Sequence, residues 1–179
     1  MMQKILIVSH CILNKSSKVE HDEDSLAEEY ATRFDFLQTA IKNDIQLIQL
    51  PCPEFIMYGS RRWGHVKNQF DNPFFRENCR KMFLPILNQI EEYISRKDKF
   101  NITGIVSVEG SPSCGNNLTC ISKEWKGEFS DCNSLENKLK SLEMKNEQGV
   151  FMKIISDMMK ENNIDIPILS MQEALKKIQ

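Results

Sequence analysis

The chain has 179 residues, of which 41% are hydrophobic and 27% are charged, and its formal net charge is −2. This composition is typical of a globular domain with one sizeable core, and the slight negative charge weighs against nucleic-acid binding, which requires a basic surface. No apolar run is long enough to span a bilayer and no signal peptide is recognisable, so we expect a cytoplasmic protein that binds no membrane.

Short apolar runs alternate with helical patterns along the whole chain. The apolar runs, which are typical of strands buried in a parallel sheet, cover residues 4–9, 45–50, 102–108 and 166–169. The helical patterns cover residues 25–43, 72–96, 149–162 and 170–178. This alternation predicts one domain over residues 1–179, with a Rossmann-like, three-layer α/β fold. We expect a short parallel sheet with strand order about 2-1-3-4, flanked by helices on both faces.

Some segments carry more detailed expectations. The helix at 25–43 is expected to bury an apolar stripe formed by Leu26, Tyr30, Phe34, Leu37 and Ile41. Residues 54–71 are expected to form a long functional loop, and Pro85 to kink the helix at 72–96 or delay its start. Residues 116–148 are expected to be irregular, with a hairpin near 120–129 and a helical piece near 135–142.

A cysteine follows each of the first three predicted strands: Cys11, Cys52 and Cys114. The carboxyl ends of parallel strands meet at one edge of the sheet, where open α/β folds bind ligands. Three soft thiolates at that edge can hold an iron–sulfur cluster or a zinc ion with one coordination position free, and the residues alone do not separate these two. The remaining cysteines lack flanking signals and are expected to be non-ligands: Cys79, Cys120 and Cys132.

The motifs around the first three cysteines resemble those of the TudS family of thiouracil desulfidases. That family carries a cysteine after strand one, Cys-Pro-Glu after strand two and Ser-Pro-Ser-Cys-Gly after strand three. This chain has Cys11, then Cys52-Pro53-Glu54, then Ser111-Pro112-Ser113-Cys114-Gly115. A helix start at Gly149-Val150-Phe151-Met152 is also similar, so the resemblance spans most of the chain.

The resemblance implies a [4Fe–4S] cluster held by Cys11, Cys52 and Cys114, with one iron free to take sulfur from a small, thiouracil-like thiolated substrate. It also implies that Glu54 and Ser111 are catalytic. Glu54 is expected to shuttle protons, and Ser111 to hydrogen-bond or relay a proton at the carbon that loses sulfur. Water replaces the sulfur, which leaves as hydrosulfide, so the reaction needs no net redox change.

Further residues near the motifs are candidates for substrate binding, because arginine attracts anionic or carbonyl-rich groups and tryptophan stacks on heterocycles. These candidates are His10, Arg61, Arg62, Trp63 and Ser113. Residues 14–19 and 55–63 depart from the family pattern and are expected to line the substrate pocket.

Two alternatives to the desulfidase remain open. One is metal-free sulfur transfer through a persulfide on Cys114, whose pKa would be lowered by the backbone amides that follow Gly110. The other is a non-catalytic module that retains the cluster or a zinc ion. The sequence does not decide the assembly state, for which a homodimer is one expectation.

Overall fold

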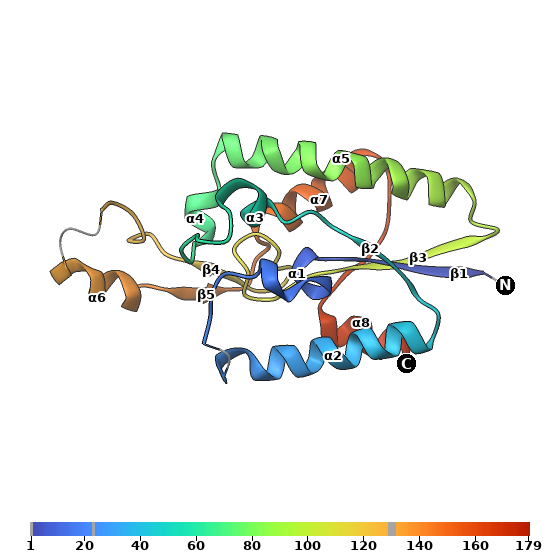
Figure 1. Ribbon diagram of the computed structural model, residues 1–179. Coiled ribbons are helices and arrows are strands. Elements are labelled where there is room, and N and C mark those ends of the chain that lie inside the picture. The colour runs from blue at the N-terminus through green and yellow to red at the C-terminus, as the bar shows by residue number, and fades with distance from the viewer. Residues whose placement is uncertain (1, 23, 129–131) are drawn as a thin grey trace.

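The centre of the protein is a four-stranded parallel sheet in the order β2-β1-β3-β6 (Figure 1). The computed structural model describes residues 2–22, 24–128 and 132–179. The strands of the sheet are β1 (Gln3–Val8), β2 (Gln46–Gln49), β3 (Phe100–Val106) and β6 (Ile168–Leu169). The predicted α/β class and the predicted strand order are therefore confirmed.

Helices cover both faces of this sheet (Figure 1). The helices α5 (Pro73–Ser95) and α7 (Val150–Glu161) pack together on one face, and α2 (Ala27–Lys42) and α8 (Met171–Ile178) pack together on the other. With both faces covered, the four apolar residues that end β1 are all buried. Among the described helices, none is both long and apolar enough to cross a lipid bilayer.

The predicted helix starts are confirmed by their caps. The side chain of Asn72 accepts a hydrogen bond from the backbone amide of Phe75 at 3.0 Å, and Ser170 accepts one from Glu173 at 3.2 Å. The carboxylate of Glu173 in turn accepts from the Ser170 amide at 2.7 Å, which completes a capping box. The helix α5 begins at Pro73 and continues past Pro85, so the interior proline does not delay its start.

The predicted apolar stripe of α2 is wrong at Phe34 and Ile41, whereas Leu37 packs against the core as predicted. The side chains of Phe34 and Ile41 are 59% and 75% exposed, whereas Phe36 and Ala40 are fully buried. Arg33 donates from Nε to the carbonyl of Ile12 at 2.6 Å. Arg33, Phe36 and Ala40 share one face at three- and four-residue steps, so the face that packs on the protein combines this hydrogen bond with two buried side chains.

Residues 54–71 are not a continuous loop as predicted, because two short helices lie within them. The helix α3 (Pro53–Tyr58) starts with a proline, which is pre-organised for the first helical position, and α4 (Lys67–Phe70) follows. A further short helix, α1 (His10–Leu13), follows β1 directly and was not predicted. All three helices lie near the carboxyl edge of the sheet (Figure 1).

The predicted hairpin near residues 120–129 is also wrong. The strand β4 (Thr119–Ile121) pairs antiparallel with β5 (Glu143–Lys145), and the helix α6 (Cys132–Lys140) lies between them in the chain. The predicted helical piece near 135–142 corresponds to α6. Phe129, at the end of the predicted hairpin, lies outside the described residues.

Candidate functional site

The cysteines predicted as ligands lie in three segments at the carboxyl edge of the sheet. Cys11 lies in α1, directly after β1, and Cys52 is the residue before α3, after β2. Cys114 lies in the loop after β3. Because β2, β1 and β3 are parallel neighbours, their carboxyl ends open onto a common edge. The connection from β1 to β2 runs through α2 on one face of the sheet, and the connection from β2 to β3 runs through α5 on the other. Such a switch point is the usual ligand position in open α/β folds.

The pKa values of the three thiols are shifted mainly by burial. Burial raises the pKa of the Cys11 thiol to about 12, with Lys18 opposing the shift and Cys52 adding to it. Burial also raises the pKa of Cys114 well above its ordinary value, and both other thiols raise it further. The direction is opposite to the lowered pKa expected for Cys114, because loss of water outweighs the hydrogen bond of the Ser113 hydroxyl, which lowers the pKa.

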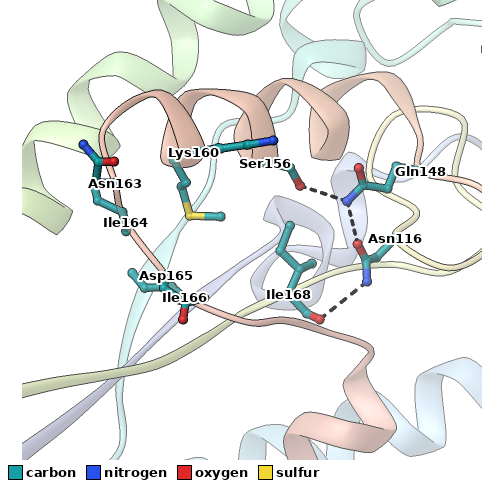
Figure 2. A pocket seen from close by; sticks show the side chains of 10 residues that line it. Asn116, Gln148, Ser156, Lys160, Asn163, Ile164, Asp165, Ile166 and Ile168 are labelled. Atoms are coloured by element: carbon teal, nitrogen blue, oxygen red, sulfur yellow. Dashed lines mark hydrogen bonds between the residues drawn. The ribbon is translucent and has the colours of Figure 1, made fainter.

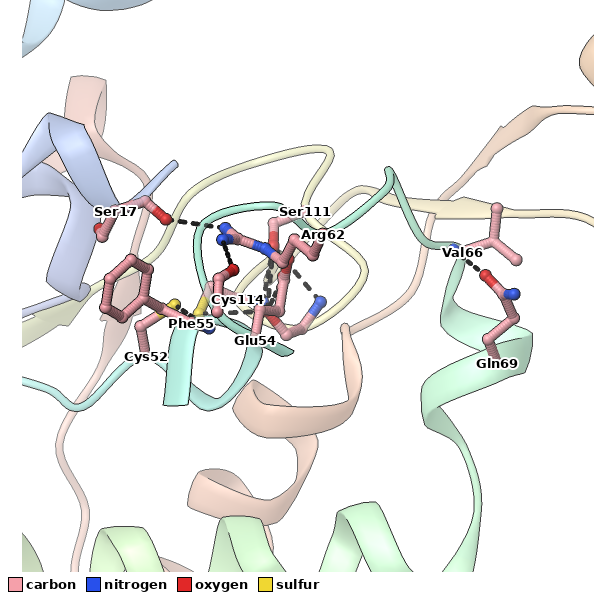
Figure 3. Close-up of polar contacts among 11 residues, drawn as sticks. Ser17, Cys52, Glu54, Phe55, Arg62, Val66, Gln69, Ser111 and Cys114 are labelled. Carbon is pink, nitrogen blue, oxygen red and sulfur yellow. Dashed lines mark hydrogen bonds and ion pairs between the residues drawn. The ribbon is translucent and has the colours of Figure 1, made fainter. Parts of the chain in front are cut away.

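The carboxylate of Glu54 bridges two of these segments (Figure 3). Its Oε1 accepts a hydrogen bond from the Ser113 hydroxyl at 2.5 Å, and its Oε2 faces Nε of Arg62 at 3.4 Å. The side chains of Glu54 and Arg62 are only 13% and 3% exposed. The Ser113 hydroxyl also lies 3.6 Å from the sulfur of Cys114. A proton-accepting group is thus connected through one hydroxyl to a candidate ligand.

The two serines of the third motif have different positions. The hydroxyl oxygen of Ser111 accepts hydrogen bonds from the backbone amides of Cys114 at 3.0 Å and Ser113 at 3.3 Å, which shapes the turn. It also lies 3.3 Å from the Ser113 hydroxyl. Ser113, which is 1% exposed, contacts the Glu54 carboxylate directly. The structure therefore places Ser113 between the two residues that the sequence assigns to catalysis.

Glu109 supports the same loop and was missed by the sequence reasoning. Its Oε2 accepts hydrogen bonds from the backbone amides of Asn117 at 2.9 Å and Leu118 at 2.8 Å. Its Oε1 accepts from the Ser107 hydroxyl at 2.8 Å. No local motif marks this role, since the two amides are eight and nine residues away from the carboxylate. Glu109 therefore closes the loop that carries Cys114.

The positions of the other substrate-binding candidates differ from that of Ser113. His10 is half-buried at the start of α1, and its carbonyl accepts a hydrogen bond from Gln49 at 3.2 Å. Arg61 is exposed, and Trp63 is 76% exposed. Trp63 lines a small cavity of about 130 Å³ with His65 and other residues, and none of the three candidate ligands is among its described lining residues.

The remaining cysteines differ in their surroundings. Cys79 is fully buried in α5, within the main core, and Cys120 is half-buried in β4. The side chain of Cys132 lies outside the described part of the chain.

The start of α7 packs directly on the turn that carries Cys114. The amides of Val150 and Phe151 donate to the carbonyls of Pro112 and Ser113 at 3.0 and 2.9 Å. These bonds satisfy helix amides that have no partner within the helix. A Cβ on Gly149 would lie 2.7 Å from the carbonyl carbon and oxygen of Ser113, so only glycine permits this approach. The glycine that starts the helix thus helps to position the third cysteine.

Gly149→Ala is expected to lower the free energy of unfolding by about 1–3 kcal/mol, because the added methyl group meets rigid backbone atoms. Urea unfolding followed by circular dichroism measures the change. Gly64→Ala is the matched control, since a Cβ there would meet nothing within 4 Å. Equal stability of Gly149→Ala and Gly64→Ala would show that the turn moves freely away from α7.

A separate hollow of about 640 Å³ lies beside α7 and β6 (Figure 2). Gln148 donates from Nε2 to Asn116 and to Ser156, both at 2.9 Å, and Asn116 reaches the carbonyl of Ile168 at 3.5 Å. None of the candidate site residues is among its described lining residues. The amide network connects the edge strand to α7 and does not extend to the thiols.

One comparison with known proteins identifies a relative. The chain is 32% identical over 163 residues to a protein of Methanocaldococcus jannaschii named "Uncharacterized protein MJ0003". The similarity covers 88% of this chain and 98% of that protein. No family model matches the chain, and no solved structure is significantly similar to it. On this nearly full-length similarity, the chain belongs to the family that includes the Methanocaldococcus protein.

Proposed function

We propose that the protein is a non-redox desulfidase that removes sulfur from a small thiolated, thiouracil-like compound with a [4Fe–4S] cluster bound by Cys11, Cys52 and Cys114. The observation that carries this proposal is the placement of three cysteine segments at the carboxyl edge of the sheet, with the Glu54 carboxylate hydrogen-bonded to Ser113 in the turn of the third cysteine. The thiols supply a cofactor site, and Glu54 supplies a group that can accept and return a proton.

The donor set fits an iron–sulfur cluster. Three thiolates that are buried together repel one another, and a cationic group between them offsets that cost. Thiolate sulfur is the ligand of iron–sulfur clusters, and three thiolates leave one iron of a four-iron cluster without a protein ligand. Zinc held by the same three thiolates is the alternative that metal analysis distinguishes.

The cluster, when bound, supplies an iron without a protein ligand that can accept the substrate's sulfur. Glu54 is placed to take a proton from the attacking water at its carboxylate and to return one to the substrate. The Ser113 hydroxyl holds Oε1 of Glu54 in place at 2.5 Å. Ser111, within 3.3 Å of the Ser113 hydroxyl, can pass a proton toward the carbon that loses sulfur. Water supplies the oxygen of the product, and the sulfur leaves as hydrosulfide.

Burial weighs against metal-free persulfide chemistry. Cys114 is buried, and burial raises the pKa of Cys11, Cys52 and Cys114, whereas a nucleophilic cysteine needs a lowered pKa. A non-catalytic cluster module explains the thiols but not the hydrogen-bonded carboxylate beside them.

Anaerobic purification followed by iron, acid-labile sulfide and zinc analysis with a visible spectrum tests the proposal. We expect a brown protein with about four irons and four sulfides per chain, and release of hydrosulfide from thiolated pyrimidines. A colourless protein with stoichiometric zinc would indicate that zinc, with a metal-activated water, is the cofactor in place of the cluster. A metal-free protein, even after cluster reconstitution, would overturn the proposal, and a full cluster without hydrosulfide release would leave only the binding module.

A further inference from the structure

Arg62 lies inside the protein, although the preceding residue, Arg61, is exposed. Only 3% of the Arg62 side chain is exposed. Its guanidinium donates from Nη2 to the carbonyl of Ser17 at 2.7 Å, from Nη1 to the carbonyl of Gly59 at 3.0 Å, and from Nε to Glu54 at 3.4 Å (Figure 3). A buried charge is tolerated only where such partners replace its water. The guanidinium of Arg62 is therefore hydrogen-bonded to groups of the protein itself.

The acceptors of Arg62 belong to two of the three cysteine segments. Ser17 ends the short 3-10 turn that follows the helix of Cys11, and Glu54 lies two residues after Cys52. The other carboxylate oxygen of Glu54 accepts the hydroxyl of Ser113, in the third segment. One continuous series of polar contacts thus crosses all three segments.

The backbone before Arg62 turns so that the arginine side chain lies back against the cysteine segments. Gly59, directly after α3, has a φ of +73° and a ψ of −170°, a conformation that is accessible almost only to glycine. This residue reverses the chain so that Arg62 lies back over the start of α3. The guanidinium then uses its planar fork of separate donors, which a lysine ammonium cannot reproduce.

We propose that Arg62 is a positioning residue that holds the three cysteine segments together before any cofactor binds. Two of the segments contact it directly, and the third contacts it through Glu54. The proposal takes the three cysteines as the site, but it concerns the reduced, metal-free protein, so it does not depend on desulfidase activity. It differs from the substrate-binding role that the sequence suggests for this arginine.

Alkylation of individual cysteines in the reduced, metal-free protein tests this role. With iodoacetamide and mass spectrometry, we expect Arg62→Gln to label Cys52 and Cys114 about tenfold faster than the wild type, because the segments open more often without their charge-assisted hydrogen bonds. Cys79 in the core of α5 is an internal control for global unfolding, and its rate is expected to stay unchanged. Arg61→Gln, the matched exposed control, should label like the wild type.

A double-mutant cycle tests whether Arg62 acts through Glu54. Glu54→Ala should itself raise the labelling of Cys114, and adding Arg62→Gln should raise it little further. Wild-type rates in Arg62→Gln, or equal acceleration of Cys79, would overturn the proposal. If Arg62→Gln does not fold, Arg62→Lys keeps the charge with fewer simultaneous donors, and the same selective labelling is expected; wild-type rates there would also refute it. No iron or substrate enters the assay, so its result is separate from that of the proposed function.

Discussion

Glu54→Gln is expected to lower hydrosulfide release by about 10²–10⁴-fold while the iron and sulfide content stays at the wild-type level. The amide oxygen can still accept the hydrogen bond of Ser113, but it cannot take a proton from water. Steady-state turnover with a thiolated pyrimidine and iron analysis of the same sample measure both quantities. Glu77→Gln on the exposed surface of α5 is the matched control, since Glu77 forms a solvent-exposed ion pair with Lys81.

A Glu54→Gln variant with wild-type turnover would exclude Glu54 as the proton carrier. A variant that loses turnover and cluster together would instead indicate that Glu54 holds the segments in place. The two outcomes are distinguishable because iron content and turnover are measured separately. Glu54→Ala, which also removes the contact to Ser113, is expected to be at least as impaired as Glu54→Gln.

Serine in place of Cys11, Cys52 or Cys114 is expected to reduce the iron content of the anaerobically reconstituted protein to background in each single variant. A hydroxyl is a hard, weakly acidic ligand and does not replace a thiolate on an iron–sulfur cluster. Cys79→Ser is the control, because this thiol is buried in the α5 core. Its cluster content should match the wild type even where its stability is lower.

Retention of about four irons per chain in any one of the three serine variants would refute the three-ligand assignment. Circular dichroism and urea unfolding of the apo variants separate loss of a ligand from loss of the fold. Equal loss of iron in Cys79→Ser would indicate that stability, rather than ligation, decides cluster content.

The sheet could be predicted because the sequence signals that specify its strands are local. The apolar run that forms β1 is continuous, as expected for a strand covered on both faces, and the alternation with helices limits the possible strand orders. The orientation of α2 could not be predicted, since the face that it buries includes Arg33, whose partner is the carbonyl of Ile12, 21 residues away. The pairing of β4 with β5 is equally non-local, because α6 lies between the two strands in the chain.

The candidate site could be predicted only as a set of ligands. Cysteines at the ends of adjacent strands must lie near one edge, so the gathering of Cys11, Cys52 and Cys114 follows from topology. Which serine meets Glu54 depends on the backbone of the turn, where Ser111 caps amides and Ser113 faces the carboxylate. The burial of Arg62 next to the exposed Arg61 could not be predicted either, because no sequence signal distinguishes two adjacent arginines.

The segment between Gly115 and Gly149 closes on itself at its base, where the amide of Gly149 donates to the carbonyl of Gly115 at 2.8 Å. Its strands β4 and β5 and the helix α6 extend away from this base (Figure 1), and near the base Ser122 and Trp125 donate hydrogen bonds to Asn68 and to the carbonyl of Gly64. Changes of length at the far end therefore cost little closure entropy and need not be transmitted to Cys114. An engineer can therefore insert a tag or reporter at the far end of this excursion without moving the turn that carries Cys114.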